Sequence, residues 1–377
     1  MRTKQEQNKV RRRLLYLWFP HFSIERHKRI EIDKRAKQDD FSGIIIIQDR
    51  AGRRVVIASC PLAFQMGVAV GLSLEDALAA CPSLLVFEAD LIADQLAIET
   101  LARWCGRYTP LVSIDKANKG LGNAGIWLDI TGCAHLFGGE ADLLNDIIAR
   151  LTAINWTAFG AISDTPGSAW AVARFSGGVT QLITPGEQQA ALSELPLSAL
   201  RLPKNTVDDL SKVGLRKISQ LMLVPRAPLR ARFGKNIRLR LDQALGIEKE
   251  TVSPQTLHSP YLARLVLLEP ISNSETIKQI LGHLLPQVIE MLVTRSLGIR
   301  QLRFSLYKID GKVQELKIRT SEVSQNSDVI LRLFSEKIDN YLLDAGVDVV
   351  TLEATETDVI QYKQVHLNNE SETSELK

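Results

Sequence analysis

The sequence predicts an α+β protein of several domains. Its 377 residues are too many for one ordinary hydrophobic core, since chains above roughly 250–300 residues usually divide. Strand-like and helix-like segments alternate in the first half, which favours an α/β region with a smaller inserted lobe. The segments after residue 261 follow the order β-α-β-β-α-β, which is typical of a ferredoxin-like sheet.

Composition places the chain among ordinary globular proteins and excludes some classes. Hydrophobic residues make up 45% and charged residues 24% of the sequence, as in typical soluble domains. The net charge is only +3, so a nucleic-acid surface has to come from local clustering of basic residues. No apolar stretch is long enough to cross a membrane, and we expect a cytoplasmic protein. The four cysteines contain no C-x-x-C pair and predict neither a disulfide framework nor a metal site.

The N-terminal half gives clear element signals. The run LLYLWF, residues 14–19, is typical of a buried strand. GIIIIQ and RVVIAS flank the turn DRAGR and predict a β-hairpin. Residues 73–81 begin with Ser73 as an N-cap, and Pro82 ends the helix that they predict. The other predicted elements of this half are the helix 93–108, the strand 126–130, the helix 140–153 and the strand 157–162.

A helical and strongly basic region follows at residues 178–250. Residues 201–240 contain 11 basic and 2 acidic residues, a net charge of +9. Six of these cations lie in PRAPLRARFGKNIRLRL and are candidate DNA-contacting residues: Arg226, Arg230, Arg232, Lys235, Arg238 and Arg240. Such a cluster can bind backbone phosphates in a salt-dependent way. A solvated helix surface is the alternative.

A polar linker at 251–260 leads to the last folded module, 261–355. Its predicted elements are the strands 262–268, 300–308, 312–319 and 347–354 and the helices 274–295 and 327–344. Three of its cations are further DNA-contact candidates: Arg303, Lys317 and Arg319. Lys317 and Arg319 are two residues apart and should share a strand face, whereas Arg300 and Arg303 should point to opposite faces.

Both ends of the chain are polar. Residues 1–13 contain 6 basic and 1 acidic residue, a net charge of +5. They predict either a solvated tail or a weak phosphate-binding arm. Residues 356–377 predict a frayed polar tail.

With these elements in order, the chain resembles the Y-family translesion DNA polymerases over residues 14–355, and most of all their ImuB branch. The segments that carry the resemblance are LYLWFPHFSIER, ASCPLAFQMGVAVGLSLEDALAACP, GIWLDITGCAHLFGGE, AISDTPGSAWAVAR and GLRKISQLMLVPRAPLRARFG. Membership implies a palm, fingers, a thumb and a little finger. On this chain the resemblance assigns 14–19 and 85–177 to the palm, 20–84 to the fingers, 178–250 to the thumb and 261–355 to the little finger.

The resemblance also implies a catalytic centre, and its residues are missing here. Y-family polymerases hold two divalent metals about 4 Å apart with carboxylates. The family's carboxylate positions on the first strand fall at Trp18 and Pro20, or at Tyr16 and Trp18 if Glu25 is the anchor. Anchoring LDIT at 128–131 places the family's Asp-Glu pair at Ala124 and Gly125. We therefore expect no catalytic residues, no metal ligands and no cofactor.

Three further observations bear on this expectation. The family's triphosphate-binding Tyr and Arg positions fall at Pro61 and Phe64, and its palm lysines fall at Pro166 and Gly177. Asp115 either binds a metal or is a solvated loop carboxylate paired with a nearby lysine. Asp129 is expected to accept backbone N–H bonds at the TGC turn.

The resemblance therefore implies a non-catalytic polymerase-like protein that acts in DNA-damage tolerance. Its expected partners are primer-template DNA, the sliding clamp, an ImuA-type protein and an error-prone replicative-type polymerase. QVHLN, residues 364–368, is the only candidate clamp motif and lacks the terminal aromatic residue. Two alternatives stay open. One is an active atypical polymerase that uses Asp115, Asp129 and Mg²⁺, and the other is a decayed protein that no longer binds DNA.

Overall fold

The computed structural model describes residues 11–32, 43–118, 120–251, 255–256, 259–339 and 345–359. The predicted clamp motif and most of the two predicted tails lie outside these residues. The chain divides into two compact units. The first contains Met1–Leu257 with Asp310–Val313, and the second contains His258–Ile309 with Gln314–Lys377.

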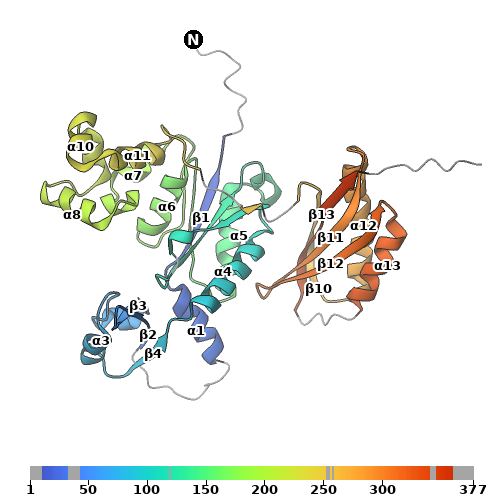
Figure 1. The fold of residues 1–377 in the computed structure, drawn as a ribbon, viewed down its shortest axis with the longest axis horizontal. Helices are drawn as coiled ribbons and strands as arrows, with labels where there is room; N and C mark the ends of the chain where they lie inside the picture. The colour runs from blue at the N-terminus through green and yellow to red at the C-terminus, as the bar shows by residue number, and fades with distance from the viewer. Residues whose placement is uncertain are drawn as a thin grey trace, which may run out of the picture. The chain divides into compact units, whose positions relative to one another are not determined.

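The first unit is built on a six-stranded sheet with the order β8-β7-β1-β6-β5-β9. Its strand β1 is labelled in Figure 1. Its strands are β1 (Leu14–Phe19), β5 (Leu111–Ile114), β6 (Ala124–Asp129), β7 (Phe159–Ser163), β8 (Gln181–Leu182) and β9 (Gln255–Thr256). β1 lies between β6 and β7 and is antiparallel to both. β9 pairs with β5, so two residues of the predicted linker extend this sheet.

The two faces of this sheet have different cores because side chains alternate along β1. Leu15, Leu17 and Phe19 pack on the side of α4 (Leu91–Cys105) and α5 (Glu140–Ala153). Tyr16 and Trp18 point to the other side and belong to the core that α6 (Pro166–Phe175) shares. α6 therefore covers the face of β1 on which the family's carboxylates are expected.

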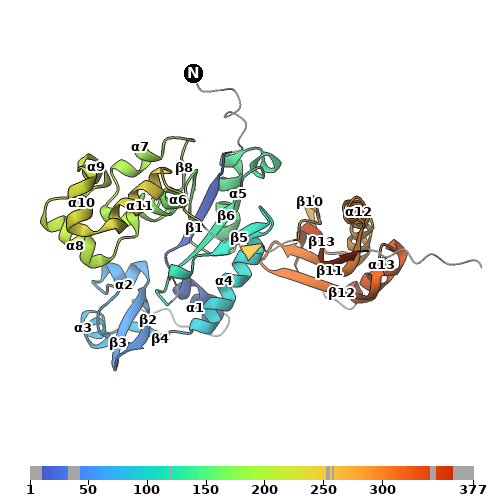
Figure 2. The ribbon, with the colours of Figure 1, turned by 45° about the horizontal axis from the view of Figure 1, so that its top comes forward.

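A small lobe contains the sheet β3-β2-β4 (Figure 2). Its elements are α1 (Phe22–Ile32), β2 (Gly43–Arg50), β3 (Arg53–Ser59), α2 (Pro61–Gln65), α3 (Leu74–Ala80) and β4 (Leu84–Glu88). The predicted hairpin is present as the antiparallel pair of β2 and β3. The Ser73 hydroxyl caps α3 by accepting from the Asp76 N–H, as the sequence indicates. The predicted boundary at residue 84 falls inside this lobe, because β4 pairs with β2.

The basic region is helical, as predicted. Its helices are α7 (Gln188–Ser193), α8 (Lys204–Lys212), α9 (Ile218–Leu223), α10 (Arg226–Phe233) and α11 (Lys235–Leu245). Gly214 lies in the turn between α8 and α9 with a φ of 86°, a conformation that favours glycine. α11 packs closely on α6, since a Cβ atom on Gly167 would lie 2.8 Å from the Ala244 Cα. The Thr165 hydroxyl also donates to the Ala244 carbonyl at 2.7 Å.

The second unit has the predicted β-α-β-β-α-β order. Its elements are β10 (Leu262–Ile271), α12 (Ser274–Val293), β11 (Leu297–Lys308), β12 (Val313–Ser324), α13 (Ser327–Ile338) and β13 (Val347–Val359). The sheet order is β10-β13-β11-β12, so β13 separates the two strands that α12 connects. β13 extends to Val359, and the predicted polar tail therefore begins inside this strand.

One predicted detail of β11 was wrong. The pairing of β11 with β13 shifts register between Ile299 and Leu302. Both of these residues lie in the core although they are three apart. The bulge therefore changes the alternation of the strand, and Arg300 and Arg303 both lie opposite the helix-covered face. The sequence spacing had placed them on opposite faces.

Candidate functional site

Tyr16 fills the place where the resemblance expects a metal-binding pair. Trp18 lies opposite Gly125, and Phe19 lies opposite Ala124, in the pairing of β1 with β6. An ideal Cβ atom on Gly125 would lie 2.1 Å from the Tyr16 hydroxyl oxygen and 2.7 Å from Cζ. No side chain fits at position 125 while Tyr16 keeps this conformation. The aromatic residue and a carboxylate at position 125 therefore exclude each other.

Asp115 is a structural acceptor in a polar network. It follows β5 directly, and its N–H donates to the Gly125 carbonyl at 2.9 Å. Its Oδ2 atom accepts from Tyr16 Oη at 2.8 Å, Asn118 Nδ2 at 3.0 Å and Trp170 Nε1 at 3.2 Å. Oδ1 accepts the Ala117 N–H at 3.1 Å. Both oxygens are thus engaged by other groups, which contradicts the interpretation of Asp115 as a solvated carboxylate. Lys119, a candidate lysine partner, lies outside the described residues.

The Tyr16 hydroxyl is held neutral by its surroundings. Burial raises the pKa of Tyr16 well above its ordinary value, and the nearby charge of Asp115 raises this pKa further. The hydroxyl also accepts a hydrogen bond from Asn118 Nδ2 at 3.2 Å. Tyr16 is therefore a fixed hydrogen-bond donor to Asp115 at neutral pH.

Arg174 connects this network to the aromatic side chains of the same face. Its guanidinium carbon lies 4.6 Å from the Trp170 ring centroid and 5.0 Å from that of Trp18. Its Nη1 atom donates to Asn118 Oδ1 at 2.8 Å. Trp170 and Arg174 are four residues apart on α6, which places them on one side of the helix. We name the set Tyr16, Trp18, Asp115, Asn118, Trp170 and Arg174 the palm plug.

The palm plug does not fit a pair of Mg²⁺ ions. Such ions need several oxygen ligands, and the plug offers one carboxylate whose oxygens already accept four hydrogen bonds. Arg174 adds a positive charge that opposes cation binding. In the part of the chain that the structure describes, no group of three or more His, Cys, Asp or Glu residues is arranged to hold a metal.

Asp129 lies at the opposite end of β6 and does not join Asp115. It is four residues beyond Gly125, which corresponds to about 13 Å along a strand. Arg12 donates to Asp129 Oδ2 at 2.9 Å, and Thr131 donates to Oδ1 through its N–H and its hydroxyl. The predicted structural role at the TGC turn is confirmed, and Arg12 is an additional partner.

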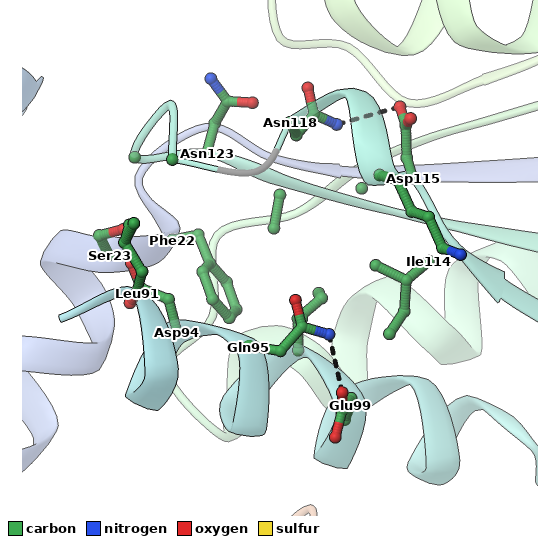
Figure 3. A pocket seen from close by; sticks show the side chains of 16 residues that line it. Phe22, Ser23, Leu91, Asp94, Gln95, Glu99, Ile114, Asp115, Asn118 and Asn123 are labelled. Atoms are coloured by element: carbon green, nitrogen blue, oxygen red, sulfur yellow. Dashed lines mark hydrogen bonds between the residues drawn. The ribbon is translucent and has the colours of Figure 1, made fainter.

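A cavity of about 460 Å³ lies beside the palm plug, between α4 and the loop that joins β5 to β6. In Figure 3, Gln95 and Glu99 reach it from α4, while Asp115 and Asn118 reach it from the loop. Ala124 and Gly125 also line it. Asp94 on its wall is held by Ser23 at 2.6 Å and by Arg26 at 2.5 Å. Acidic and amide groups thus dominate its polar lining, which disfavours a triphosphate.

The positions of the family's triphosphate contacts carry no cation. Phe64 on α2 is 64% exposed and apolar. Pro166 is the buried first residue of α6, and Gly177 has a φ of 74° in the turn after this helix. The residues at these four predicted positions therefore offer no side chain that pairs with phosphate.

The predicted DNA contacts of the basic region divide into two groups. Arg230, Arg232 and Lys235 are exposed and have no ion pair among the described residues. Arg238 is paired with Asp242 at 2.8 Å, and Arg240 is paired with Glu250 at 3.2 Å. The side chain of Arg226 lies outside the described part. The first group is therefore the better placed to meet phosphates.

The cations of the second unit are engaged to different degrees. Arg303 is 20% exposed and pairs with Glu353, whose side chain is fully buried. Lys317 and Arg319 share an exposed face, as predicted, since they alternate with the buried Leu316 and Ile318. They are 51% and 71% exposed and have surface partners in Glu315 and Glu356. Arg303 therefore stabilises the sheet, whereas the other two face solvent.

Sequence reasoning missed most of the palm plug. The family's motif marks Trp18 and Tyr16 only as replacements for aspartates, and it does not mark Arg174 or Asn118. The sequence does contain one signal for Arg174. Trp170 and Arg174 are four residues apart in GSAWAVAR, and residues at i and i+4 share a helix face.

No helix in the described ranges combines the length and the apolar character that a bilayer span requires.

Residues 38–174 match the model of the impB/mucB/samB family. Protein ImuB of Caulobacter vibrioides (strain NA1000 / CB15N) is 36% identical over 309 residues, which cover 82% of this chain and 66% of that protein. DNA polymerase IV of Shewanella frigidimarina is 27% identical over 343 residues, covering 86% of this chain and 92% of the relative.

Solved structures show the same fold. The insertion ternary complex of Dbh DNA polymerase gives a TM-score of 0.54 at 14% identity, covering 90% of this chain and 97% of that one. DinB from Sulfolobus solfataricus gives a TM-score of 0.51 at 13% identity with the same coverage. The chain spans just under two thirds of the ImuB relative's length. This chain therefore contains a domain of the impB/mucB/samB family, the Y-family polymerase domain, and has the fold of the solved Y-family polymerases.

Proposed function

We propose that this protein is a non-catalytic Y-family polymerase-like protein that binds damaged primer-template DNA during translesion synthesis. The palm plug is the observation that carries this proposal. Tyr16 occupies the space of a side chain at position 125, and Asp115 is committed to four hydrogen bonds. A polymerase palm needs free carboxylate oxygens at this point.

The remaining folded framework supports a binding role. The core of the palm sheet is intact on both faces. The exposed cations Arg230, Arg232 and Lys235 give the thumb a phosphate-binding surface. The solved structures of this fold include ternary complexes of a DNA polymerase. We therefore assign DNA contact first to the thumb, and next to Lys317 and Arg319 of the second unit.

The proposed partners follow from the similarity to ImuB. They are the sliding clamp, an ImuA-type protein and an error-prone replicative-type polymerase that performs the synthesis. The protein would then act by recruitment in the cytoplasm at the bacterial nucleoid, as part of the SOS response to DNA damage. The described residues supply no clamp motif for this role, and the predicted one at 364–368 lies outside them.

One observation favours a second candidate, an active atypical polymerase. Asp115 lies directly beside Gly125 at the end of the sheet where the family's chemistry takes place. Against this candidate, Asp129 is about 13 Å away along β6, and two metals about 4 Å apart need a shared set of carboxylates.

DNA binding through the thumb is tested with the full chain on a primer-template at several salt concentrations. We expect binding that weakens steeply with salt, and we expect Arg230→Ala and Arg232→Ala each to reduce the slope of log K against log[salt] by about one. Arg103→Ala is a matched control, because Arg103 is an exposed arginine on α4, which packs on the other face of the palm sheet. Absence of binding at low salt would favour a decayed protein and contradict the proposal.

A further inference from the structure

The sheet of the second unit carries a row of ion pairs on the face that its helices leave open. The cations of this row come from β11 and β12 and are Arg300, Arg303, Lys317 and Arg319. Each is paired with a carboxylate, and these partners are, in the same order, Asp358, Glu353, Glu315 and Glu356. Three of the four carboxylates belong to β13. This strand therefore cancels much of the positive charge of its neighbours.

The thumb's cations have a different environment. Arg230, Arg232 and Lys235 are exposed and make no ion pair among the described residues. Their charge is free to attract phosphate, and each contact with phosphate releases counterions from the DNA. The row on the second unit has as many carboxylates as cations, so it should attract DNA far less strongly than the thumb does.

One pair of the row is part of the fold. Glu353 is fully buried, and it accepts from Arg303 Nε and from the Ser259 N–H at 2.7 Å. Removal of either partner would leave a buried group unpaired, which is costly. Arg303 is therefore bound permanently and is not available to an external anion.

Two pairs at the end of β13 are built differently. Arg319 Nη2 lies 3.1 Å from Glu356 Oε2, and Arg300 Nη2 lies 3.6 Å from Asp358 Oδ2. All four of these side chains are more than a third exposed. Exposed pairs of this kind contribute little to stability because water screens them. Both arginines can therefore exchange their carboxylate for another anion at little cost.

The same two arginines line one groove. This groove has a volume of about 490 Å³ and is bounded by Arg300, Arg319, Thr320 and Ser321. Arg300 Nη1 donates to the Ser321 carbonyl at 2.9 Å, which orients the guanidinium, and the Thr320 hydroxyl donates to the Ile299 carbonyl at 2.9 Å. The planar guanidinium matches the geometry of phosphate oxygens. The groove thus brings together two arginines whose carboxylate partners are weakly held.

We infer that Glu356 and Asp358 form an electrostatic gate that regulates DNA binding by the second unit. In the free protein these carboxylates neutralise Arg319 and Arg300. DNA phosphates have to displace them before the arginines make contact. The second unit therefore adds its contacts to a complex that the thumb has formed, and it does not capture DNA by itself. The inference rests on the proposed DNA-binding function and adds a regulation to its surface on the second unit.

Neutral variants of the two carboxylates test the gate. Binding of the full chain to a fluorescein-labelled primer-template is measured by anisotropy at several salt concentrations, for the wild type and for the double variant Glu356→Gln, Asp358→Asn. We expect the double variant to bind about threefold more tightly or better at low salt, since two exposed pairs no longer compete. The slope of log K against log[salt] should become steeper by about one to two, because two more cations then meet phosphate unpaired. An affinity and a slope equal to those of the wild type would overturn the inference.

A control variant separates the gate from a general change in charge. Glu290→Gln removes the same charge from an exposed position on α12, which packs on the other face of the sheet. It should leave the affinity unchanged, and a gain as large as that of Glu356→Gln would contradict the gate.

A double-mutant cycle tests whether Glu356 acts through its arginine. In an Arg319→Gln background, Glu356→Gln should bring no gain over the Glu290→Gln control. An equal gain in both backgrounds would exclude the pair as the regulating contact. Thermal unfolding of each variant shows whether a changed affinity reflects a changed fold.

The two proposals fail in different ways. If neither the wild type nor the double variant binds DNA at low salt, the proposed function fails. If the wild type binds with a salt dependence that Arg230→Ala reduces, and the double variant binds no more tightly, DNA binding stands and only the gate is contradicted.

Discussion

The two ends of strand β1 differ in the chemistry that they retain. At its start, Arg13 is buried and pairs with Glu140 and Asp164, each at 2.6 Å. It also donates to the Ile183 carbonyl at 2.9 Å. At its other end, where the family's metal ligands are expected, Trp18 and Tyr16 lie against Gly125 and beneath Arg174. One end carries an arginine–carboxylate network, and the other carries aromatic rings where the resemblance places carboxylates.

This difference between the two ends is physically consistent with the proposed non-catalytic role. Carboxylates that have a buried cation as partner stabilise the fold, whereas clustered carboxylates without a bound metal repel one another. With Ala124, Gly125 and Trp18 at the positions that the resemblance gives to carboxylates, no such repulsion arises and the rings pack. At the other end, the Arg13 guanidinium lies between two carboxylates and offsets their repulsion.

Removal of Arg13 should have the largest effect on stability. Arg13→Met leaves Glu140 and Asp164 without their buried partner, and we expect a loss of about 3–5 kcal/mol in the free energy of unfolding. Arg12→Ala is the control at the same end, because Arg12 is 39% exposed and its pair with Asp129 should contribute under about 1 kcal/mol. Urea denaturation measures both. Equal losses for the two variants would remove the distinction between the buried network and a surface pair.

A smaller effect is expected from a methyl group at the plugged end. Gly125→Ala places a Cβ atom on the Tyr16 ring and should cost about 1–3 kcal/mol. In a Tyr16→Ala background the ring is absent, so the added methyl group should cost little. A double-mutant cycle from denaturation curves gives the coupling energy. If Gly125→Ala has the same cost in both backgrounds, Tyr16 is not what excludes a side chain from position 125.

The smallest effect is expected at alkaline pH, where the ionisation of Tyr16 should lower the free energy of unfolding. Burial and the charge of Asp115 raise the pKa of Tyr16 in the folded state, so the folded protein holds this proton more tightly than the unfolded chain. The resulting stability is fully present below about pH 10 and is lost as pH rises further, by about 1.4 kcal/mol per pH unit for one such tyrosine. Tyr16→Phe should therefore reduce the pH slope of the free energy of unfolding between roughly pH 10 and 11.5.

Tyr108 provides a reference on the other face of the sheet. Burial and the charge of Asp146 raise its pKa as well, so Tyr108→Phe should reduce the alkaline slope to a similar extent. An unchanged slope in Tyr16→Phe, together with a reduced slope in Tyr108→Phe, would mean that Tyr16 ionises normally in the fold. The network around Asp115 would then be weaker than its geometry indicates.

The sequence predicts well those elements whose signals lie in residues close together in the chain. The strand 14–19, the hairpin around DRAGR and the Ser73 cap all depend on neighbouring residues, and the structure contains them. The β-α-β-β-α-β order is likewise visible from periodicity. The missing carboxylates could also be located, because the family's motif defines their positions in the chain.

Features that depend on pairing register could not be predicted from the sequence. The hairpin of β5 and β6 brings Asp115 against Gly125, although the loop between them hides this proximity in the sequence. The bulge in β11 moves Arg300 to the face of Arg303. The partner of Arg303, Glu353, lies on a strand fifty residues away. Such contacts follow from tertiary packing, which no local pattern encodes.

Primer extension is the most direct test of the claim that this palm does no chemistry. The full chain is incubated with primer-template DNA, all four nucleotides and either Mg²⁺ or Mn²⁺, with a catalytically active Y-family polymerase as the positive control. We expect no extension above the no-enzyme background with either metal, although the protein binds the DNA. Robust incorporation that Asp115→Ala abolishes would contradict the account and would identify Asp115 as a metal ligand.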